Sequence, residues 1–286
     1  MIIPFQKDEA LLNDIAACKR RDGFRTWWLG QSGFLVQWEG RHLLFDPYLS
    51  DSLTKKYATT DKPHVRMTER VVDPARLDFI DVVTSSHNHT DHLDGETLGP
   101  LREVNPELQL ILPEANWAFA VNRLGCDMDW PVGLKAGESK TLSGFTIHGI
   151  PAAHNELETD EEGRHKFMGF VATFGDYAVY HCGDTLWFDG MVDWLKDWKV
   201  DVAFLPINGN KPERRVAGNL DGEEAARLGK EIGAGCVIPC HYEMFEFNTA
   251  SPGLFVNTAE RLGQSCKVLE AGEKLEVVKE NLLFES

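Results

Sequence analysis

The sequence predicts an α/β fold, in which strands and helices alternate along the chain. Short apolar or aromatic runs punctuated by glycine, typical of strands, are separated by segments whose apolar residues recur at helical spacing. The run Leu77–Ser86 has an apolar, β-branched centre that indicates a buried strand, and a group of potential metal ligands follows it directly. Open α/β folds place their sites beyond the carboxyl ends of strands, and this order of features fits that rule.

The N-terminal part begins with an expected helix and continues with strands. Apolar residues at helical spacing predict an amphipathic helix over residues 8–21, which would pack on the domain as an extension spanning residues 1–22. The polar residues 50–75 contain several lysines and arginines and are expected to form a loop or lid. Between these segments, three runs separated by glycine turns predict strands at Phe24–Leu29, Phe34–Glu39 and His42–Phe45.

The middle of the chain continues the alternation. Two helices are expected, at Leu93–Leu101 and at Glu114–Leu124, the second ended by Gly125, with a strand at Leu108–Leu112 between them. The acidic residues 155–166 are expected to form a surface loop near the mouth of the site. Two hairpin-like pairs flank that loop, Ser139–Leu142 with Phe145–Ile150 and Phe167–Phe174 with Tyr177–His181.

The C-terminal part adds further helices and strands, and no internal repeat interrupts the pattern. The length and the 43% hydrophobic content suit one domain over residues 1–286. Helices are expected at Met191–Trp198, Asp221–Ile232 and near Thr258–Leu262. Strands are expected at Val200–Ile207, Cys236–Pro239, and near Val268–Leu269 and Leu275–Val278.

Four side chains that can bind a metal lie within six positions, His87, His89, Asp91 and His92. His87 and His89 are two apart and can point the same way from an extended turn, whereas Asp91 and His92 lead into the next helix. A loop this short cannot aim all four groups at one tetrahedral ion without strain, but it can serve two neighbouring ions. Three histidines and one aspartate at this spacing indicate metal binding rather than packing.

Three further candidate ligands, His154, Asp184 and His241, follow the ends of other expected strands. Scattered core residues would not show that coincidence. The expected division places His87, His89 and His154 in a first site and Asp91, His92 and His241 in a second. Asp184 has two oxygens and can bridge both ions, and Gly183 permits the tight turn before it.

Such a site would supply a nucleophile without a serine or cysteine. Two divalent ions roughly 3.5–4 Å apart can hold a hydroxide between them and polarise a carbonyl or phosphoryl oxygen. Asp91 could orient that hydroxide or accept its proton. Histidine and carboxylate ligands suit zinc, manganese, iron, cobalt or nickel, and we expect two ions of zinc or manganese, with iron as an alternative.

Other residues are candidates for supporting or binding roles. Asp46 ends a strand and would hydrogen-bond the ligand loop, or else serve only its own turn, and His181 is assigned the same supporting role. The basic loop with Lys211, Arg214 and Arg215 would hold an anionic group of the substrate, or else be a solvated loop. His42 and His64 have no partner in the sequence and are not expected to be ligands, and His148 is expected to be structural. Cys182 and Cys240, beside the ligands, are expected to be small packing residues.

Composition limits the partners. The formal net charge of −16 disfavours a nucleic-acid binder, because phosphate neutralisation requires a surface rich in lysine and arginine. A small, anionic substrate remains compatible, since divalent ions can dominate the local field. No apolar run reaches the length of a membrane span, the N-terminus lacks the pattern of a signal peptide, and six scattered cysteines fit a reduced, cytoplasmic protein. A homo-oligomer is left open.

The ligand motif Ser86–His92, with His154, Gly183–Thr185 and His241, resembles the metallo-β-lactamase superfamily. The resemblance covers nearly the whole chain and implies a four-layer αββα sandwich, two mixed β-sheets flanked by helices, with the site along one edge. Segments 28–34, 45–47 and 238–245 resemble the branch of ascorbate-6-phosphate lactonase, although Gln31 stands where many relatives have histidine. That branch also contains a lipid-cleaving phospholipase D, but no membrane-binding surface is legible in this sequence.

These observations lead to a metal-dependent hydrolase that opens a lactone or cleaves an ester-like bond of a small, sometimes phosphorylated, metabolite. A phosphodiesterase acting on small phosphodiesters is a second hydrolase hypothesis. An iron-dependent oxidoreductase is a third, because some members of the superfamily use iron for redox chemistry. A binding or sensor protein that keeps its metals without turnover is a fourth, and the open coordination positions disfavour it.

Overall fold

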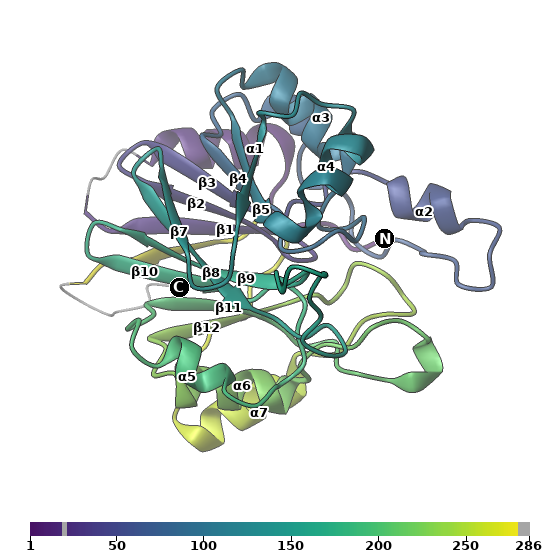
Figure 1. Cartoon of the computed structure of the whole chain (residues 1–286). Coiled ribbons are helices and arrows are strands. Elements are labelled where there is room, and N and C mark those ends of the chain that lie inside the picture. The colour runs from purple at the N-terminus through teal and green to yellow at the C-terminus, as the bar shows by residue number, and fades with distance from the viewer. Residues whose placement is uncertain (19–21, 280–286) are drawn as a thin grey trace.

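Two β-sheets pack face to face, and helices cover the outer face of each (Figure 1). The computed structural model describes residues 1–18 and 22–279. In Figure 1, α1, α3 and α4 lie over one sheet, and α5, α6 and α7 lie against the other. The predicted four-layer α/β sandwich is confirmed.

Within residues 1–18 and 22–279, the first sheet has seven strands and mixed pairing. Its N-terminal strands and β13 pair antiparallel, whereas β3, β4, β5 and β6 pair in parallel. In spatial order the strands are β13 (Lys274–Val277), β1 (Phe24–Gly30), β2 (Gly33–Trp38), β3 (Arg41–Phe45), β4 (Val82–Thr84), β5 (Gln109–Pro113) and β6 (Pro131–Leu134).

The second sheet, also mixed, has six strands in the part of the chain that the structure describes. Strand β11 pairs in parallel with both β10 and β12, and the strands from β7 to β10 pair antiparallel. In spatial order the strands are β12 (Cys236–Cys240), β11 (Val202–Pro206), β10 (Tyr177–His181), β9 (Met168–Phe174), β8 (Phe145–Pro151) and β7 (Ser139–Leu142).

Helices connect the strands and bury one side of each sheet. None of those described for residues 1–18 and 22–279 is both long and apolar enough to span a lipid bilayer. The α-helices are α1 (Asp8–Ala17), α2 (Ser52–Tyr57), α3 (Gly95–Val104), α4 (Trp117–Leu124), α5 (Met191–Leu195), α6 (Gly222–Glu231) and α7 (Gly253–Leu262). Three short 3-10 turns are η1 (Pro74–Arg76), η2 (Glu114–Asn116) and η3 (Pro212–Arg214).

The main core lies between the sheets and is rich in aromatic side chains. The rings of Phe34 and Phe204, from opposite sheets, stack with centroids 4.0 Å apart. Phe24 meets Phe174 edge-to-face at 5.3 Å. These contacts bury large apolar areas from both sheets, which is the dominant stabilising term in folding. The core therefore fixes the two sheets against each other.

A second core lies between the first sheet and its helices. Leu11 and Ile15 of α1 and Leu98 and Leu101 of α3 are buried there with the outward-facing residues of the strands. The expected amphipathic helix is confirmed over Asp8–Ala17, and residues 19–21 of its predicted range lie outside the described residues.

Three local features differ from the sequence expectations. The stretch 50–75, expected to be a loop, contains α2, of which only Leu53 is buried, so it lacks the apolar spacing that reveals a helix. Strand β6 was not expected, because proline and glycine weaken its signal, but pairing with β5 holds it in place. The apolar pair at residues 268–269 forms no strand.

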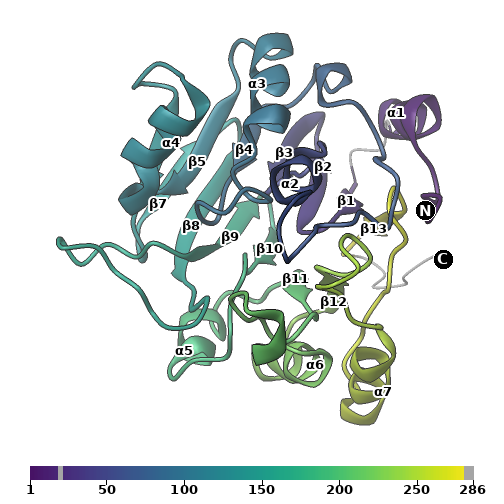
Figure 2. The same ribbon diagram turned by 90° about the vertical axis from the view of Figure 1, so that its right-hand side faces the viewer.

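The strands that precede the candidate ligands end at one edge of the sandwich. Strands β4, β8, β10 and β12 are followed by the segments carrying His87, His154, Asp184 and His241, respectively. Figure 2 views this edge, with α2 in front of the strand ends. Two rigid sheets therefore position side chains that lie more than 150 residues apart in sequence, from His87 to His241.

Helix α6 provides a test of local stability. The Asp221 Oδ1 atom accepts a hydrogen bond from Glu224 N at 2.9 Å, and Glu224 Oε2 accepts one from Asp221 N at 3.0 Å. We expect Asp221→Ala to lower the free energy of unfolding by about 1 kcal/mol, because the backbone N–H of Glu224 in the first turn loses its partner. Urea denaturation followed by circular dichroism measures this, and an effect no larger than that of the exposed Glu107→Ala would contradict it.

Candidate metal centre

The loop after β4 is held rigidly before it reaches α3. Ser85 Oγ donates to the His87 carbonyl oxygen at 2.8 Å, and Leu93 N donates to the His89 carbonyl oxygen at 2.8 Å. Asp94 then begins α3, accepting a hydrogen bond from Glu96 N at 3.3 Å. The histidine-rich segment is thus an ordered turn between a strand and a capped helix.

Asp46, predicted to support this loop, is fully buried at the end of β3 and lies beside it. Its carboxylate accepts hydrogen bonds from Ser86 N at 3.0 and 3.1 Å and from Thr84 Oγ1 at 2.8 Å. It also lies 2.7 Å from His92 Nδ1. This contact turns His92 Nε2 toward the centre, as carboxylates commonly do for metal-binding imidazoles.

The other three candidate ligands come from the second sheet. His154 Nδ1 lies 3.0 Å from the Gly218 carbonyl oxygen, which directs Nε2 inward. Gly183, with φ of +62°, makes the tight turn before Asp184, and a Cβ there would come within 2.6 Å of Ser86. His241 has φ of +61° and donates its backbone N–H to the Gln31 carbonyl oxygen at 3.0 Å.

These loops bring all seven predicted ligand side chains together. One cluster, here the three-histidine cluster, consists of His87, His89 and His154; another, the mixed cluster, consists of Asp91, His92 and His241. Within each, the ligand atoms lie within 4.8 Å of one another. The predicted division into two sites therefore has a geometric counterpart in the structure.

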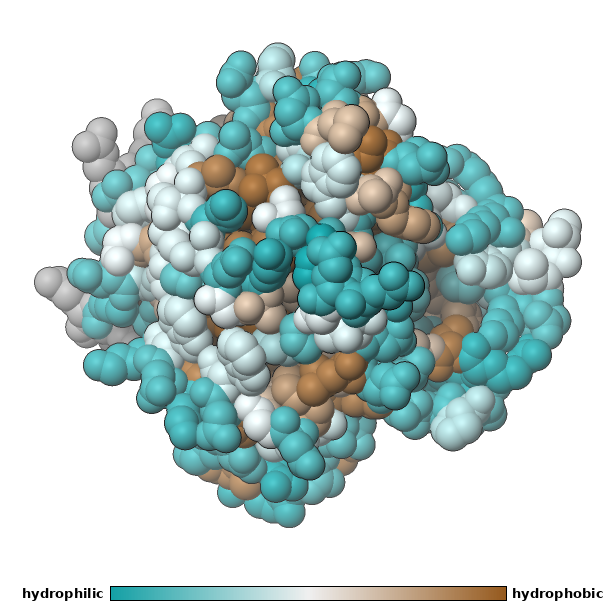
Figure 3. All heavy atoms as spheres, viewed as in Figure 1, coloured by the Kyte–Doolittle hydropathy of each residue, from teal (hydrophilic) through white to brown (hydrophobic). Residues whose placement is uncertain are grey.

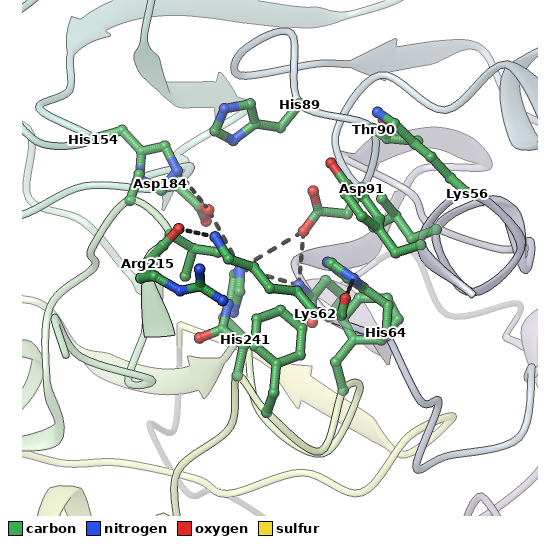
Figure 4. Close-up of a pocket in the computed structure, with 18 of the residues that line it drawn as sticks. Lys56, Lys62, His64, His89, Thr90, Asp91, His154, Asp184, Arg215 and His241 are labelled. Carbon is green, nitrogen blue, oxygen red and sulfur yellow. Dashed lines mark hydrogen bonds and ion pairs between the residues drawn. The ribbon is translucent and has the colours of Figure 1, made fainter. Parts of the chain in front are cut away.

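Asp184 lies between the two clusters. Its Oδ2 atom is 3.5 Å from His154 Nε2 and 3.3 Å from His241 Nε2, and its Oδ1 atom is 3.4 Å from His92 Nε2. Figure 4 shows Asp184 between His154 and His241, with Asp91 facing it across the pocket. A carboxylate so placed can reach ions in both clusters.

The donor set fits divalent metal ions. His87 Nε2, His92 Nε2 and Asp184 Oδ1 are buried and have no hydrogen-bond partner among the residues that the structure describes. A buried polar atom without a hydrogen-bond partner destabilises the folded state. Here the three unpartnered atoms belong to one group of side chains that could hold a metal ion. Cation coordination would satisfy all three, which explains why the fold tolerates them.

The histidines of the two clusters differ in the direction of their pKa shifts. Burial lowers the pKa of His154 to about 4 and that of His87 well below its usual value. Burial acts the same way on His92 and His241, but the negative charge of Asp184 outweighs it and raises both pKa values. For Asp184 itself, burial is outweighed by the neighbouring imidazoles, chiefly His241 and His92, so its pKa lies well below the usual range.

A cavity of about 350 Å³ opens above the two clusters. Figure 3 shows the surface hollowed between two projecting segments, α2 with the residues after it and the loop 209–218. Exposed Asp61 pairs with Arg215 at 2.6 Å, and Lys62 Nζ donates to the Arg215 carbonyl oxygen, so the tips of these segments touch across the mouth. The cavity volume suits a small molecule.

Cationic and aromatic side chains form the wall of this pocket. Lys56, Lys62, Arg123 and Arg215 line it, and Lys56 has no carboxylate within 4.0 Å among residues 1–18 and 22–279. Aromatic side chains pack behind them, with His64 stacked on Tyr57 and edge-on to Phe245 and Phe247.

Of the three basic residues predicted to bind substrate, one lines the pocket and two do not. Arg215 lines the pocket. Arg214 instead donates to the carbonyl oxygens of Asn208 at 2.6 Å and Thr249 at 2.7 Å, which holds its loop. Lys211 is exposed and does not line the cavity. The pocket cations on other segments, such as Lys56 and Arg123, were not assigned from sequence, because nothing nearby in the chain marks them as site residues.

The remaining predicted residues lie around the centre. His181 Nε2 lies 2.8 Å from the Ser32 carbonyl oxygen, and Gly183 N donates to His181 Nδ1 at 3.2 Å, so this histidine holds the turn before Asp184. Cys182 and Cys240 are buried free thiols. His64, not expected to be a metal ligand, lines the pocket and packs on aromatic rings.

Metal binding should depend on pH differently at the two clusters. Protons on His92 and His241, whose pKa values are raised, must leave before a divalent ion binds, whereas His87 and His154 are already neutral. Between about pH 6 and 8 we therefore expect the affinity of the mixed cluster to rise while that of the three-histidine cluster stays nearly constant. Calorimetric titration with Zn²⁺ in buffers of different ionisation enthalpy measures both, and equal slopes would contradict the expectation.

Comparison with known proteins identifies the family. The model of the beta-lactamase superfamily domain matches residues 41–242. A UPF0173 metal-dependent hydrolase of Alkaliphilus metalliredigens is 31% identical over 234 residues, which cover 80% of this chain and 89% of the relative. Another, from Caldivirga maquilingensis, is 28% identical over 247 residues, covering 84% and 92%.

Solved structures agree on the fold. The metallo-beta-lactamase fold protein YhfI from Bacillus subtilis aligns with a TM-score of 0.64 at 19% identity, covering 90% of this chain and 100% of its own. A possible metal-dependent hydrolase from Veillonella parvula aligns with a TM-score of 0.70 at 15% identity, with the same coverage. Together with the sequence matches and the clustered histidines and aspartates, these likenesses lead to one conclusion: the chain belongs to the metallo-β-lactamase superfamily and is a metal-dependent hydrolase related to the UPF0173 proteins.

Proposed function

We propose that this hydrolase binds two divalent ions, zinc or manganese, and opens a lactone or cleaves another ester-like bond of a small, anionic metabolite, for example a phosphorylated one. The observation that carries the proposal is the convergence of seven ligand-type side chains, of which His89, Asp91, His154, Asp184 and His241 line a cavity of about 350 Å³. The sequence resemblance to the lactonase branch supports the choice of bond.

The two clusters and Asp184 would hold the ions. Bound divalent ions lower the pKa of water and polarise a carbonyl oxygen, so that hydrolysis proceeds at neutral pH. Asp184 reaches histidines of both clusters, and Asp46 keeps His92 oriented through Nδ1. Support from a buried carboxylate fixes the ring and raises its strength as a ligand.

Asp91 is the proposed catalytic residue. Burial would raise its pKa, but the charges of His92 and His241 outweigh that effect and lower it, so the carboxylate is ionised at neutral pH. It lines the cavity, where it can accept a proton from the attacking water or orient it. Without a bound metal, the Gln31 amide donates to Asp91 Oδ2 at 2.8 Å.

The cationic wall favours an anionic substrate. The chain as a whole carries a formal charge of −16, yet Lys56, Lys62, Arg123 and Arg215 face one small pocket. Such a local excess of positive charge attracts a phosphate or carboxylate group and orients it over the metal centre.

The formal charge of −16 on the whole chain argues against nucleic acid as a partner. Six free cysteines agree with a reducing, cytoplasmic environment.

Removing one imidazole should abolish turnover without unfolding the protein. We expect His89→Ala to lower kcat/KM at least roughly a hundredfold, because the three-histidine cluster loses a ligand at the exposed mouth of the site. The assay is hydrolysis of a panel of lactones and esters, with bis-p-nitrophenyl phosphate alongside and thermal unfolding as the folding control. Full activity after chelator treatment, or turnover of the phosphodiester alone, would contradict the proposal.

A matched pair of lysines on α2 tests the anion-binding wall. We expect Lys56→Ala to raise KM for a phosphorylated substrate about three- to tenfold with little change in kcat, because an ion pair near solvent contributes modestly. The neighbouring Lys55 pairs with Glu96 at 2.7 Å, away from the cavity, so Lys55→Ala serves as control. Equal KM values for the two variants, measured at low salt, would rule out the role of Lys56.

A further inference from the structure

We propose that Gln31 is an additional ligand of the ion in the mixed cluster, through its side-chain carboxamide oxygen. This inference rests on the proposed binding of two metal ions and adds a residue that the histidine and aspartate motif does not contain. Gln31 lies in the turn between β1 and β2, far in sequence from the segments that carry His92 and His241.

The amide of Gln31 lies directly against the ligand atoms. Its Nε2 position is 2.8 Å from Asp91 Oδ2 and 3.0 Å from His241 Nε2. Within the cluster itself, Asp91 Oδ2 lies 3.7 Å from His92 Nε2 and 3.8 Å from His241 Nε2. The Gln31 amide is therefore as near to these ligand atoms as they are to one another, which is the spacing expected of groups that share one ion.

An ion in the mixed cluster changes what the Gln31 amide can do. Without metal, the NH₂ group can donate to the lone pairs of Asp91 and His241. When those lone pairs bind a cation, no acceptor is left there, and an NH₂ group would face positive charge. A half-turn about the last side-chain bond exchanges nitrogen and oxygen at nearly the same positions, since the two atoms occupy almost equivalent places in the amide. The carboxamide oxygen then points at the ion.

The oxygen of Gln31 is free to make this exchange. Oε1 is buried and has no hydrogen-bond partner among the described residues, although the side chain is only 1% exposed. Buried amide oxygens normally have a partner, so an orphaned one beside a metal-binding cluster points to a cation as the missing partner. Amide oxygens are established protein ligands of divalent ions.

The backbone of Gln31 is fixed so that the side chain reaches the cluster. Its carbonyl oxygen accepts hydrogen bonds from His241 N and from Trp28 Nε1, both at 3.0 Å. The residue has φ of +49°, a left-handed conformation that is unfavourable for glutamine. Such strain is retained where the surrounding structure requires the residue, and here it aims the amide at Asp91 and His241.

This ligand would make the two metal sites chemically different. The three-histidine cluster offers only imidazoles besides the shared Asp184, whereas the mixed cluster would offer oxygen from both Asp91 and Gln31. Oxygen ligands suit manganese better than imidazole does, so the mixed cluster should accept manganese more readily than the three-histidine cluster.

Two substitutions separate a ligand from a hydrogen-bond donor. Gln31→Leu removes both amide atoms at similar size, and Gln31→Glu retains an oxygen in the ligand position while removing the donor. If Gln31 is a ligand, Gln31→Leu should weaken binding of the second Mn²⁺ or Co²⁺ ion by roughly tenfold or more, while Gln31→Glu binds it as tightly as the wild type or more tightly. If Gln31 only donates to Asp91, Gln31→Leu leaves the coordination number of the second ion unchanged, and the visible Co²⁺ absorption stays at the wild-type level.

The readouts are the stoichiometry and affinity of Co²⁺ and Mn²⁺ measured by calorimetry and chelator competition, together with the visible Co²⁺ spectrum. A lower coordination number at the second ion in Gln31→Leu should increase the visible absorption. Unchanged or tighter second-ion binding in Gln31→Leu, or weaker binding in Gln31→Glu with the fold intact by thermal unfolding, would overturn the inference. Failure of the wild type to bind two ions would overturn the proposed function instead, because the first ion in each variant reports on the three-histidine cluster.

Discussion

The buried charge of Asp184 is the constraint on which the rest of the structure depends. A carboxylate that is 4% exposed cannot stay ionised in a protein interior unless positive groups surround it. Here the positive groups are the imidazoles of His92, from the first sheet's loop, and His241, from the second sheet, and the neutral imidazole of His154, also from the second sheet, lies 3.5 Å away. One charge therefore couples segments of both sheets at a single edge, and that edge is where the chemistry is placed.

Both sheets of the sandwich hold the segments around Asp184 rigidly in place. Aromatic packing between Phe34 and Phe204 fixes the sheets face to face, and the carboxylate of Asp46 ties the end of β3 to the ligand loop after β4. Metal sites need their ligands held within a few tenths of an ångström, and ligands at the ends of packed strands satisfy that requirement better than ligands on free loops. The cavity at this edge is bordered by α2 and the loop 209–218.

Sequence patterns predicted those parts of the molecule that depend on local rules. Strands with β-branched centres, glycine turns and the spacing from His87 to His92 each carry their own signal, so most strands and all seven clustered side chains are predicted from local patterns. The four-layer arrangement is predicted only by the resemblance to the metallo-β-lactamase superfamily. The sequence does not predict helix α2 and strand β6, because tertiary packing stabilises them and their apolar residues show no clear periodicity. The cationic residues of the pocket wall could not be predicted for a similar reason. Lys56 and Arg123 come next to the site only through the folding of α2 and α4, and no motif marks either residue.

The contact between Asp61 and Arg215 has a consequence for selectivity. Both side chains are largely solvated, and exposed ion pairs of this kind hold two segments together only weakly. A bulky molecule could part the two tips at little cost, so the entrance is a poor filter of molecular size. Discrimination among metabolites must then arise deeper, from how well a reacting group fits between the cationic wall and the ligand clusters. An enzyme built in this way would accept a family of related compounds that share one charged functional group.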